Sequence, residues 1–147
     1  MNIRTINLQS TDSTNNFLRG YVMDDNDDIV VVKADYQTAG RGQGVNKWES
    51  EDGKNLLFSL LVRPRTVPVT SQFILSMTMA VALKETLDSY AEGFELKWPN
   101  DIYYGDRKLA GVLIEHSLTS SKISQTIIGI GLNVNQQKFI SDALNPV

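Results

Sequence analysis

The sequence predicts a single α+β domain built on one β-sheet. Short apolar strands recur along the 147 residues, and one stretch near the middle, residues 70–90, repeats apolar side chains at helical spacing. A chain of this length is usually one domain and can bury roughly two thirds of its unfolded surface. No repeat, low-complexity tract or linker interrupts it, so we expect one continuous core.

The first part of the chain predicts two strands separated by a short helix. Residues 4–9 alternate apolar and polar side chains, as in a half-buried strand, and Asp12 or Ser13 can cap the helix that follows. The β-branched run 29–32 is typical of a strand buried on both faces. The acidic residues 24–28 before it are most simply a solvated loop. One face of the helix carries Phe17, Leu18, Tyr21 and Val22.

The middle of the chain predicts an apolar strand, a long helix and a further strand. Residues 55–62 form the first strand, which Pro64 closes, and residues 94–98 form the second, which ends at Pro99. Between them, residues 70–90 read as a core helix. Its apolar face is marked by Ile74, Met77 and Val81.

The final part predicts a hairpin over residues 101–117, turning at Gly105-Asp106, and a last strand over residues 123–135. Glycine weakens a strand, so glycines that face one way indicate something lying close against the backbone. That neighbour can be a ligand, a packed helix or a bulge, and the strand alone leaves these alternatives open. Alternation puts Ile128, Ile130, Leu132 and Val134 on one face of this strand and Gly129, Gly131 and Asn133 on the other.

The composition excludes several classes of function. With 14 basic and 17 acidic residues, the chain lacks the positive surface that nucleic acids require, so we expect no nucleic-acid partner. It has no cysteine and one histidine, His116, which excludes disulfides, thiolate metal sites and a zinc cage. A metal would therefore be a hard cation that arrives with a substrate. No apolar targeting or membrane-spanning run is present, so we expect a cytoplasmic protein without a membrane partner.

Three polar segments could carry chemistry. The glycine-rich residues 37–44 expose amides, with the guanidinium of Arg41 among them, and suit a carboxylate or phosphate, although such a segment is as often a surface turn. Trp48 could close over an aromatic ligand or simply anchor this loop. Residues 97–101 place a cation, an amide and a carboxylate beside a proline turn, which is also a common strand ending. Lys108 lies at the edge of an apolar strand, where lysine often snorkels.

In their order along the chain, these segments resemble the biotin protein ligase family. The resemblance extends from the first predicted helix to the last strand, and residues 97–101 with the lysine strand after them are its most specific part. It implies a mixed β-sheet flanked by helices, related to the class II aminoacyl-tRNA synthetases. The matching motifs are Ser13-Thr14-Asn15, Gly40-Arg41-Gly42-Gln43 followed by Trp48, Lys97-Trp98-Pro99-Asn100-Asp101, Lys108 to Glu115, and Gly129 to Asn135.

The resemblance implies that biotin, ATP and Mg²⁺ form biotinyl-5'-AMP, and that biotin then passes to a lysine of a biotin carboxyl carrier protein. Lys108 and Arg41 are the implied catalytic residues, because two anions must be brought together. The implied biotin-binding residues are Ser13, Thr14, Asn15, Gln37, Gly40, Arg41, Gly42, Gln43, Lys108, Gly111 and Gly129. The implied ATP or adenylate residues are Arg41, Gln43, Trp48, Asn100, Asp101, Lys108, Gly131 and Asn133, with Asp101 also holding Mg²⁺.

Two departures from the family pattern bear on these expectations. Gln43 stands where many relatives have arginine, and Gly44 to Asn46 replace further basic residues. We therefore expect looser holding of the adenylate, although glutamine can still donate a hydrogen bond to an oxyanion. Relatives continue beyond the matched part into further core structure and a small β-barrel-like domain, whereas residues 143–147 end without a terminal element. We therefore expect residues 1–147 to form a catalytic domain that is incomplete at its C-terminus, has no DNA-binding segment before it, and is compatible with a homodimer.

Three rival interpretations accompany this one. A lipoate or octanoate ligase or transferase shares the fold and the lysine chemistry, and residues 97–101 favour biotin over it. A noncatalytic biotin-binding module is compatible with an incomplete chain. A purely structural domain would use its glycines for packing.

Overall fold

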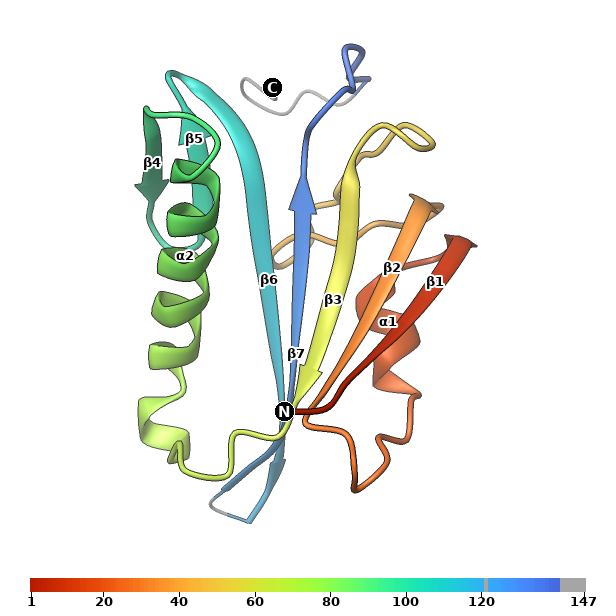
Figure 1. Cartoon of the computed structure of the whole chain (residues 1–147), viewed down its shortest axis with the longest axis vertical. Coiled ribbons are helices and arrows are strands. Elements are labelled where there is room, and N and C mark those ends of the chain that lie inside the picture. The colour runs from red at the N-terminus through yellow and green to blue at the C-terminus, as the bar shows by residue number, and fades with distance from the viewer. Residues whose placement is uncertain (121, 141–147) are drawn as a thin grey trace.

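The computed structural model describes residues 1–120 and 122–140 (Figure 1). Its strands form a seven-stranded sheet in the order β1-β2-β3-β7-β6-β5-β4. β1 and β2 are parallel, and the other neighbouring strands are antiparallel, so the predicted mixed sheet flanked by helices is confirmed. The elements are β1 (Ile3–Thr11), α1 (Thr14–Arg19), β2 (Ile29–Gln37), β3 (Leu56–Val62), the 3-10 helix η1 (Val69–Ser71), α2 (Phe73–Asp88), β4 (Phe94–Lys97), β5 (Asp101–Tyr104), β6 (Arg107–Thr119) and β7 (Lys122–Leu132).

The two α-helices cover opposite faces of the sheet. On β7, Ile127 packs in one apolar cluster with Leu18 of α1, whereas its neighbour Ile128 packs with Leu83 of α2 in another. Figure 1 shows α1 beside β1, β2 and β3, and α2 beside β4, β5 and β6. The glycines of β7 alternate with Ile128 and Ile130, and they therefore face the α1 side. The predicted alternation is confirmed as far as Leu132, where β7 ends, but Val134 lies beyond this end and is 55% exposed, so its placement on the apolar face is wrong.

The helix α1 ends before the last residues of the apolar face that the sequence predicted. It begins after Ser13, whose backbone is extended and whose amide donates to Asp12 Oδ1 at 2.7 Å. Leu18 is buried in the core, but the helix ends at Arg19. Val22 lies beyond that end and is 89% exposed, so the prediction that it shares the buried face is wrong.

The predicted core face of α2 is also wrong. Ile74, Met77 and Val81 are 48%, 48% and 46% exposed, and Ala80 is the buried residue of this helix. Leu83 and its neighbours on the Ala80 side pack on β5, β6 and β7 instead. Helical spacing located the helix correctly, but a helix whose apolar residues surround most of its circumference does not reveal which of them meets the sheet.

Two local expectations near the N-terminus also need correction. In β2, Val30 and Val32 are fully buried under the α1 cluster, but Val31 on the other face is only partly covered, because α2 lies over distant strands. The acidic loop is not entirely solvated. Asp27 is 5% exposed and accepts a hydrogen bond from Arg4 Nε at 2.6 Å, which ties the loop to β1.

The β5–β6 hairpin forms as predicted and sets the position of the lysine strand. Its two-residue turn contains Gly105, whose φ of 61° is a left-handed conformation that favours glycine. The pairing then skips Leu109, because Tyr103 faces Lys108 and Ile102 faces Ala110. This bulge shifts the strand so that Lys108 and Gly111 both reach the α1 face.

Neither α-helix in the described ranges has the length and apolar content needed to cross a bilayer. The expectation about the end of the chain, residues 143–147, lies outside the described residues.

Candidate functional site

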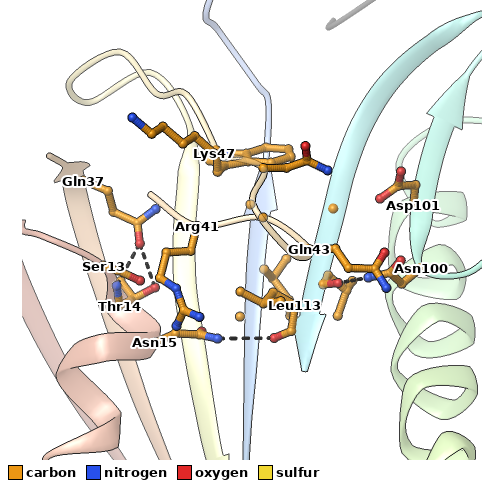
Figure 2. Close-up of a pocket in the computed structure, with 18 of the residues that line it drawn as sticks. Ser13, Thr14, Asn15, Gln37, Arg41, Gln43, Lys47, Asn100, Asp101 and Leu113 are labelled. Carbon is orange, nitrogen blue, oxygen red and sulfur yellow. Dashed lines mark hydrogen bonds between the residues drawn. The ribbon is translucent and has the colours of Figure 1, made fainter. Parts of the chain in front are cut away.

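A pocket of about 150 Å³ opens on the α1 face of the sheet (Figure 2). Its walls come from α1, the loop between β2 and β3, and the strands β5, β6 and β7. The structure thus brings together segments that are far apart in the sequence. The predicted residues that line it are Ser13, Thr14, Asn15, Gln37, Arg41, Gly42, Gln43, Trp48, Asn100, Asp101, Lys108, Gly111, Gly129 and Gly131.

Gly40 and Asn133 were also predicted to contact ligand, but neither lines the pocket. A Cβ at Gly40 would overlap the carbonyl oxygen of Trp48, so this glycine is needed where the loop closes on itself. Asn133 is buried behind the lysine strand, where its amide group donates to the Lys108 carbonyl at 3.4 Å. Both residues shape the pocket through the backbone that they hold.

One wall of the pocket is a buried network of polar side chains. Gln37 Oε1 accepts hydrogen bonds from the Thr14 amide at 2.8 Å and from the Thr14 hydroxyl at 3.0 Å. The Ser59 hydroxyl lies 2.7 Å from Thr14 Oγ1 and 2.6 Å from Asn15 Oδ1. These side chains are 9% exposed or less, so their hydrogen bonds fix their orientation.

Ser59 was missed by the sequence analysis, although a signal for it exists. It is the polar residue inside the apolar strand Leu56–Val62, and it is 0% exposed. A buried hydroxyl needs a hydrogen-bond partner, so its place in an apolar strand indicates a polar neighbour. Its register opposite Gly129 brings it into contact with Thr14 and Asn15, which line the pocket.

The glycine floor of the pocket is covered by side chains of the protein itself. A Cβ at Gly129 would overlap the Asn15 amide group, and one at Gly131 would overlap the Trp48 indole. A Cβ at Gly111, which pairs with Gly131 across the sheet, would lie 2.9 Å from Trp48 Cζ3. The close neighbours that the glycines indicated are therefore Asn15 and Trp48, and the floor is not bare in this structure.

Trp48 anchors the glycine loop to the sheet. Its amide donates to the Gly40 carbonyl at 2.9 Å, while Gly42 N donates to the Asn46 carbonyl at 2.8 Å, so the loop folds as a small hairpin. The indole lies against Gly131, and its Nε1 is buried without a hydrogen-bond partner among the described residues. Of the two interpretations of Trp48, the anchoring one describes this structure.

Arg41 binds a carboxylate that the sequence analysis left without a role. Its terminal nitrogens lie 3.0 Å from Glu115 Oε1 and 3.0 Å from Glu115 Oε2, which is bidentate geometry. Arg19 and Asn15 donate to the same carboxylate at 2.7 Å and 2.9 Å. Burial alone would raise the pKa of Glu115, but the hydrogen bonds from Asn15 and Arg41 and the charges of both arginines outweigh it and lower that pKa.

Lys108 binds a different carboxylate on the opposite side of the pocket. Its Nζ lies 2.7 Å from Asp101 Oδ2 and 5.8 Å from the centre of the Trp48 ring. Figure 2 shows Asp101 and Asn100 across the pocket from Arg41. Asn100 joins β5 to β6, because its side chain donates to the Val112 carbonyl and its own carbonyl accepts from Val112 N. Arg41 and Lys108, two of the cations that line the pocket, are therefore each held by an acid of their own.

The donors at this end suit a cation that arrives with a phosphate-bearing substrate. No group of three His, Cys, Asp or Glu side chains that could hold a metal occurs in residues 1–120 and 122–140. Asp101 supplies one carboxylate, and Mg²⁺ usually binds through one or two carboxylates plus substrate phosphates and water. These described residues therefore form no resident metal cage, and the single carboxylate of Asp101 suits a Mg²⁺ held mainly by phosphates and water.

Residues 8–133 match the Biotin/lipoate A/B protein ligase family. This match includes most of the chain, and the chain therefore belongs to that family.

Its relatives include bacterial biotin ligases. The chain is 39% identical over 109 residues to the bifunctional ligase/repressor BirA of Bacillus subtilis, a match that includes 73% of this chain and 33% of that protein. It is 36% identical over 118 residues to the biotin--[acetyl-CoA-carboxylase] ligase of Mycobacterium tuberculosis, with 74% of this chain and 41% of that protein covered. The chain thus spans less than half the length of these relatives.

The fold matches the biotin protein ligase from Aquifex aeolicus in complex with biotin and ATP. The TM-score is 0.81 at 32% sequence identity, and the match covers 98% of this chain and 58% of that chain. The seven-stranded sheet and its helices are therefore those of a biotin protein ligase fold.

Proposed function

We propose that this chain carries the catalytic centre of a biotin protein ligase, which makes biotinyl-5'-AMP from biotin and ATP and transfers biotin to a lysine of a biotin carboxyl carrier protein. The observation that supports this is the arrangement of polar and charged groups at the two ends of one pocket. A wall of buried hydroxyl and amide groups stands at one side, and the Lys108–Asp101 pair stands at the other. Such a pocket suits a ligand with a polar ring at one end and an acid at the other.

The polar wall is our candidate site for the ureido ring of biotin. This ring offers one carbonyl acceptor and two N–H donors, which hydroxyl and amide side chains complement. Ser13, Thr14, Asn15 and Gln37 present such groups. Thr14, Asn15 and Gln37 are already oriented by hydrogen bonds with one another or with Ser59. Because these hydrogen bonds hold the groups in place before the ligand arrives, binding does not have to order them.

Lys108 is our candidate for the charge that meets the reacting carboxylate. In the first step a biotin carboxylate oxygen attacks the α-phosphorus of ATP, a C–O–P anhydride forms, and pyrophosphate leaves. Two anions must approach each other, and an ammonium at their meeting point lowers that repulsion. Mg²⁺ held at Asp101 would neutralise the phosphates of ATP. The resemblance also assigns Trp48, Gly131 and Asn133 to the adenylate.

The second step needs the anhydride to survive until the carrier arrives. The carrier lysine amine attacks the anhydride carbonyl, an amide forms, and AMP leaves with the amine losing a proton. The loop that carries Arg41, Gln43 and Trp48 borders the pocket and is suited to exclude water from that bond. Gln43 is exposed and uncharged, which supports the expectation of looser adenylate retention.

The test is to incubate the purified chain with biotin and Mg·ATP and to measure biotinyl-5'-AMP by mass spectrometry together with pyrophosphate release. We expect product from the unaltered chain and at least a hundredfold less from Lys108→Ala, a loss of roughly 2.7 kcal/mol in barrier lowering. The matched control is Lys33→Ala, because Lys33 forms an exposed ion pair with Asp35 on β2, away from the pocket. Equal activity in the two variants would contradict the role of Lys108.

Parallel reactions separate the rival functions. Lipoate and octanoate replace biotin in otherwise identical mixtures, because the matched family includes lipoate ligases. Adenylate from lipoate and none from biotin would favour the sister enzyme. Biotin binding without pyrophosphate release would favour a noncatalytic module.

The same proposal includes a cytoplasmic location, where ATP and a carboxylase carrier would be available, and a homodimer, which sedimentation of the purified chain would detect.

A further inference from the structure

We propose that Glu115 is a positioning residue that fastens the glycine loop to α1 through Arg41, and that Arg41 therefore orders the loop instead of meeting the substrate carboxylate. This inference rests on the proposed ligase function. It is carried by the four hydrogen bonds that converge on one carboxylate from α1 and from the loop.

Glu115 lies where three separate segments meet. It is on β6 opposite Ile127, on the same face as Gly111 and Leu113, which line the pocket. Its partners come from far along the chain: Arg41 is 74 residues away, Arg19 is 96, and Asn15 is 100. A carboxylate held by so many donors is fixed in place, and it offers Arg41 a ready anchoring point.

The guanidinium of Arg41 is already engaged. Both terminal nitrogens bind Glu115, and one of them also donates to Asn16 Oδ1 at 3.2 Å. To bind a substrate carboxylate, Arg41 would have to give up this bidentate pair. Lys108 is held by a single acid, Asp101, at the other end of the pocket, and it therefore stays our candidate for the neutralising charge.

Glu115 also orients a residue of the polar wall. It accepts from Asn15 Nδ2 at 2.9 Å, which turns Asn15 Oδ1 toward Ser59 and lays the side chain over Gly129. One carboxylate thus connects the loop that borders the pocket with the wall proposed for the ureido ring. Removing its charge should loosen both while leaving Lys108 and Asp101 in place.

The experiment compares Glu115→Gln, Arg41→Gln and the double variant, with Asp88→Asn as the matched control. Asp88 pairs with Lys84 on α2, on the other face of the sheet. We expect each single variant to raise the biotin KM and the rate of biotinyl-adenylate release about tenfold while kcat changes less than about twofold. The double variant should lose no more than Glu115→Gln alone, because Glu115→Gln already removes the ion pair with Arg41. Asp88→Asn should behave as the unaltered chain.

A second readout does not depend on catalysis. Trypsin cleavage after Lys47, in the loop, should be faster in Glu115→Gln than in the unaltered chain, with no change in Asp88→Asn. If the unaltered chain makes no adenylate, the ligase proposal fails, and this cleavage still decides whether Glu115 holds the loop. The inference is overturned if cleavage is unchanged, or if Arg41→Gln lowers kcat at unchanged biotin KM while Glu115→Gln has no effect.

Discussion

The two faces of the sheet are covered by helices that are held in opposite ways. On one face, the six-residue helix α1 has Thr14, Asn15 and Leu18 buried, and it is tied to the strands by hydrogen bonds as well as by apolar contacts. On the other face, the sixteen-residue helix α2 has Ala80 as its buried residue and no side-chain hydrogen bond to the sheet among the described residues. The shorter helix, α1, therefore has more buried residues than the longer helix, α2.

This difference separates the part of the molecule that carries the site from the part that supports it. Burying polar groups is costly unless each finds a partner, and the α1 face contains such a buried network. The helix α2 packs on its face of the sheet through apolar contacts, with half-exposed residues on the outer side of the helix. We take the buried polar network, and not the longer helix, as the mark of the functional face.

The largest expected effect compares one apolar residue from each helix. Leu18→Ala should lower the free energy of unfolding by about 2–5 kcal/mol, because Leu18 is 1% exposed and its removal leaves a cavity. Met77→Ala should lower it by less than about 1 kcal/mol, because Met77 is 48% exposed. Urea denaturation followed by circular dichroism measures both. Equal losses would show that α2 is packed as tightly as α1 in solution.

The same contrast explains how much of the fold could be predicted from the sequence. Periodicity located the strands and both helices, because local spacing decides secondary structure. It misassigned Ile74, Met77 and Val81, because burial on α2 depends on which strands it crosses, and that is set by a sheet order that brings β7 between β3 and β6. Strand order is a long-range property that no local pattern encodes.

The second prediction compares a serine hydroxyl on the α1 face of the sheet, Ser59, with one on α2, Ser76. Ser59→Ala should cost about 1–3 kcal/mol of folding free energy, because Thr14 and Asn15 lose a buried partner. It should also weaken biotin binding through the loosened wall. Ser76→Ala on α2 is the matched control and should cost nothing, because alanine is the better helix former. Unfolding curves and biotin calorimetry test both variants, and a neutral Ser59→Ala would argue that the wall is not a cooperative network.

Site residues that belong to a sequence motif could be predicted, whereas residues that strand register brings near the pocket could not. Residues 97–101 and Lys108 are adjacent to their functional neighbours in sequence, so their motif could be recognised. Ser59 and Glu115 contact residues of the pocket because strand pairing places them opposite Gly129 and Ile127 on β7, and a register cannot be read from composition. The partner of Arg41 was missed for the same reason, since the two residues are 74 positions apart.

The smallest expected effect uses adjacent residues of β6 that face opposite sides of the sheet. Glu115 faces α1, and His116 faces the α2 side, where its ring lies 3.0 Å from Thr126 Oγ1. The pKa of each is lowered on folding, Glu115 by its hydrogen bonds and cations against the effect of burial, and His116 by burial. In both cases the unfolded chain binds the proton more readily, so the stability that each contributes is lost as the pH falls.

The two groups lose their contributions in different pH ranges. His116 contributes fully above its ordinary pKa of 6.5 and less as the pH falls below it, whereas Glu115 contributes fully above 4.5 and loses its contribution only in more acidic solution. His116→Gln should therefore flatten the stability profile between about pH 6.5 and 5. Glu115→Gln should flatten it below about pH 4.5. Thermal melts across this range measure both, and a Glu115→Gln profile that changed mainly near neutral pH would contradict the lowered pKa of that carboxyl and weaken the case that Arg41 and Arg19 hold it as an anion.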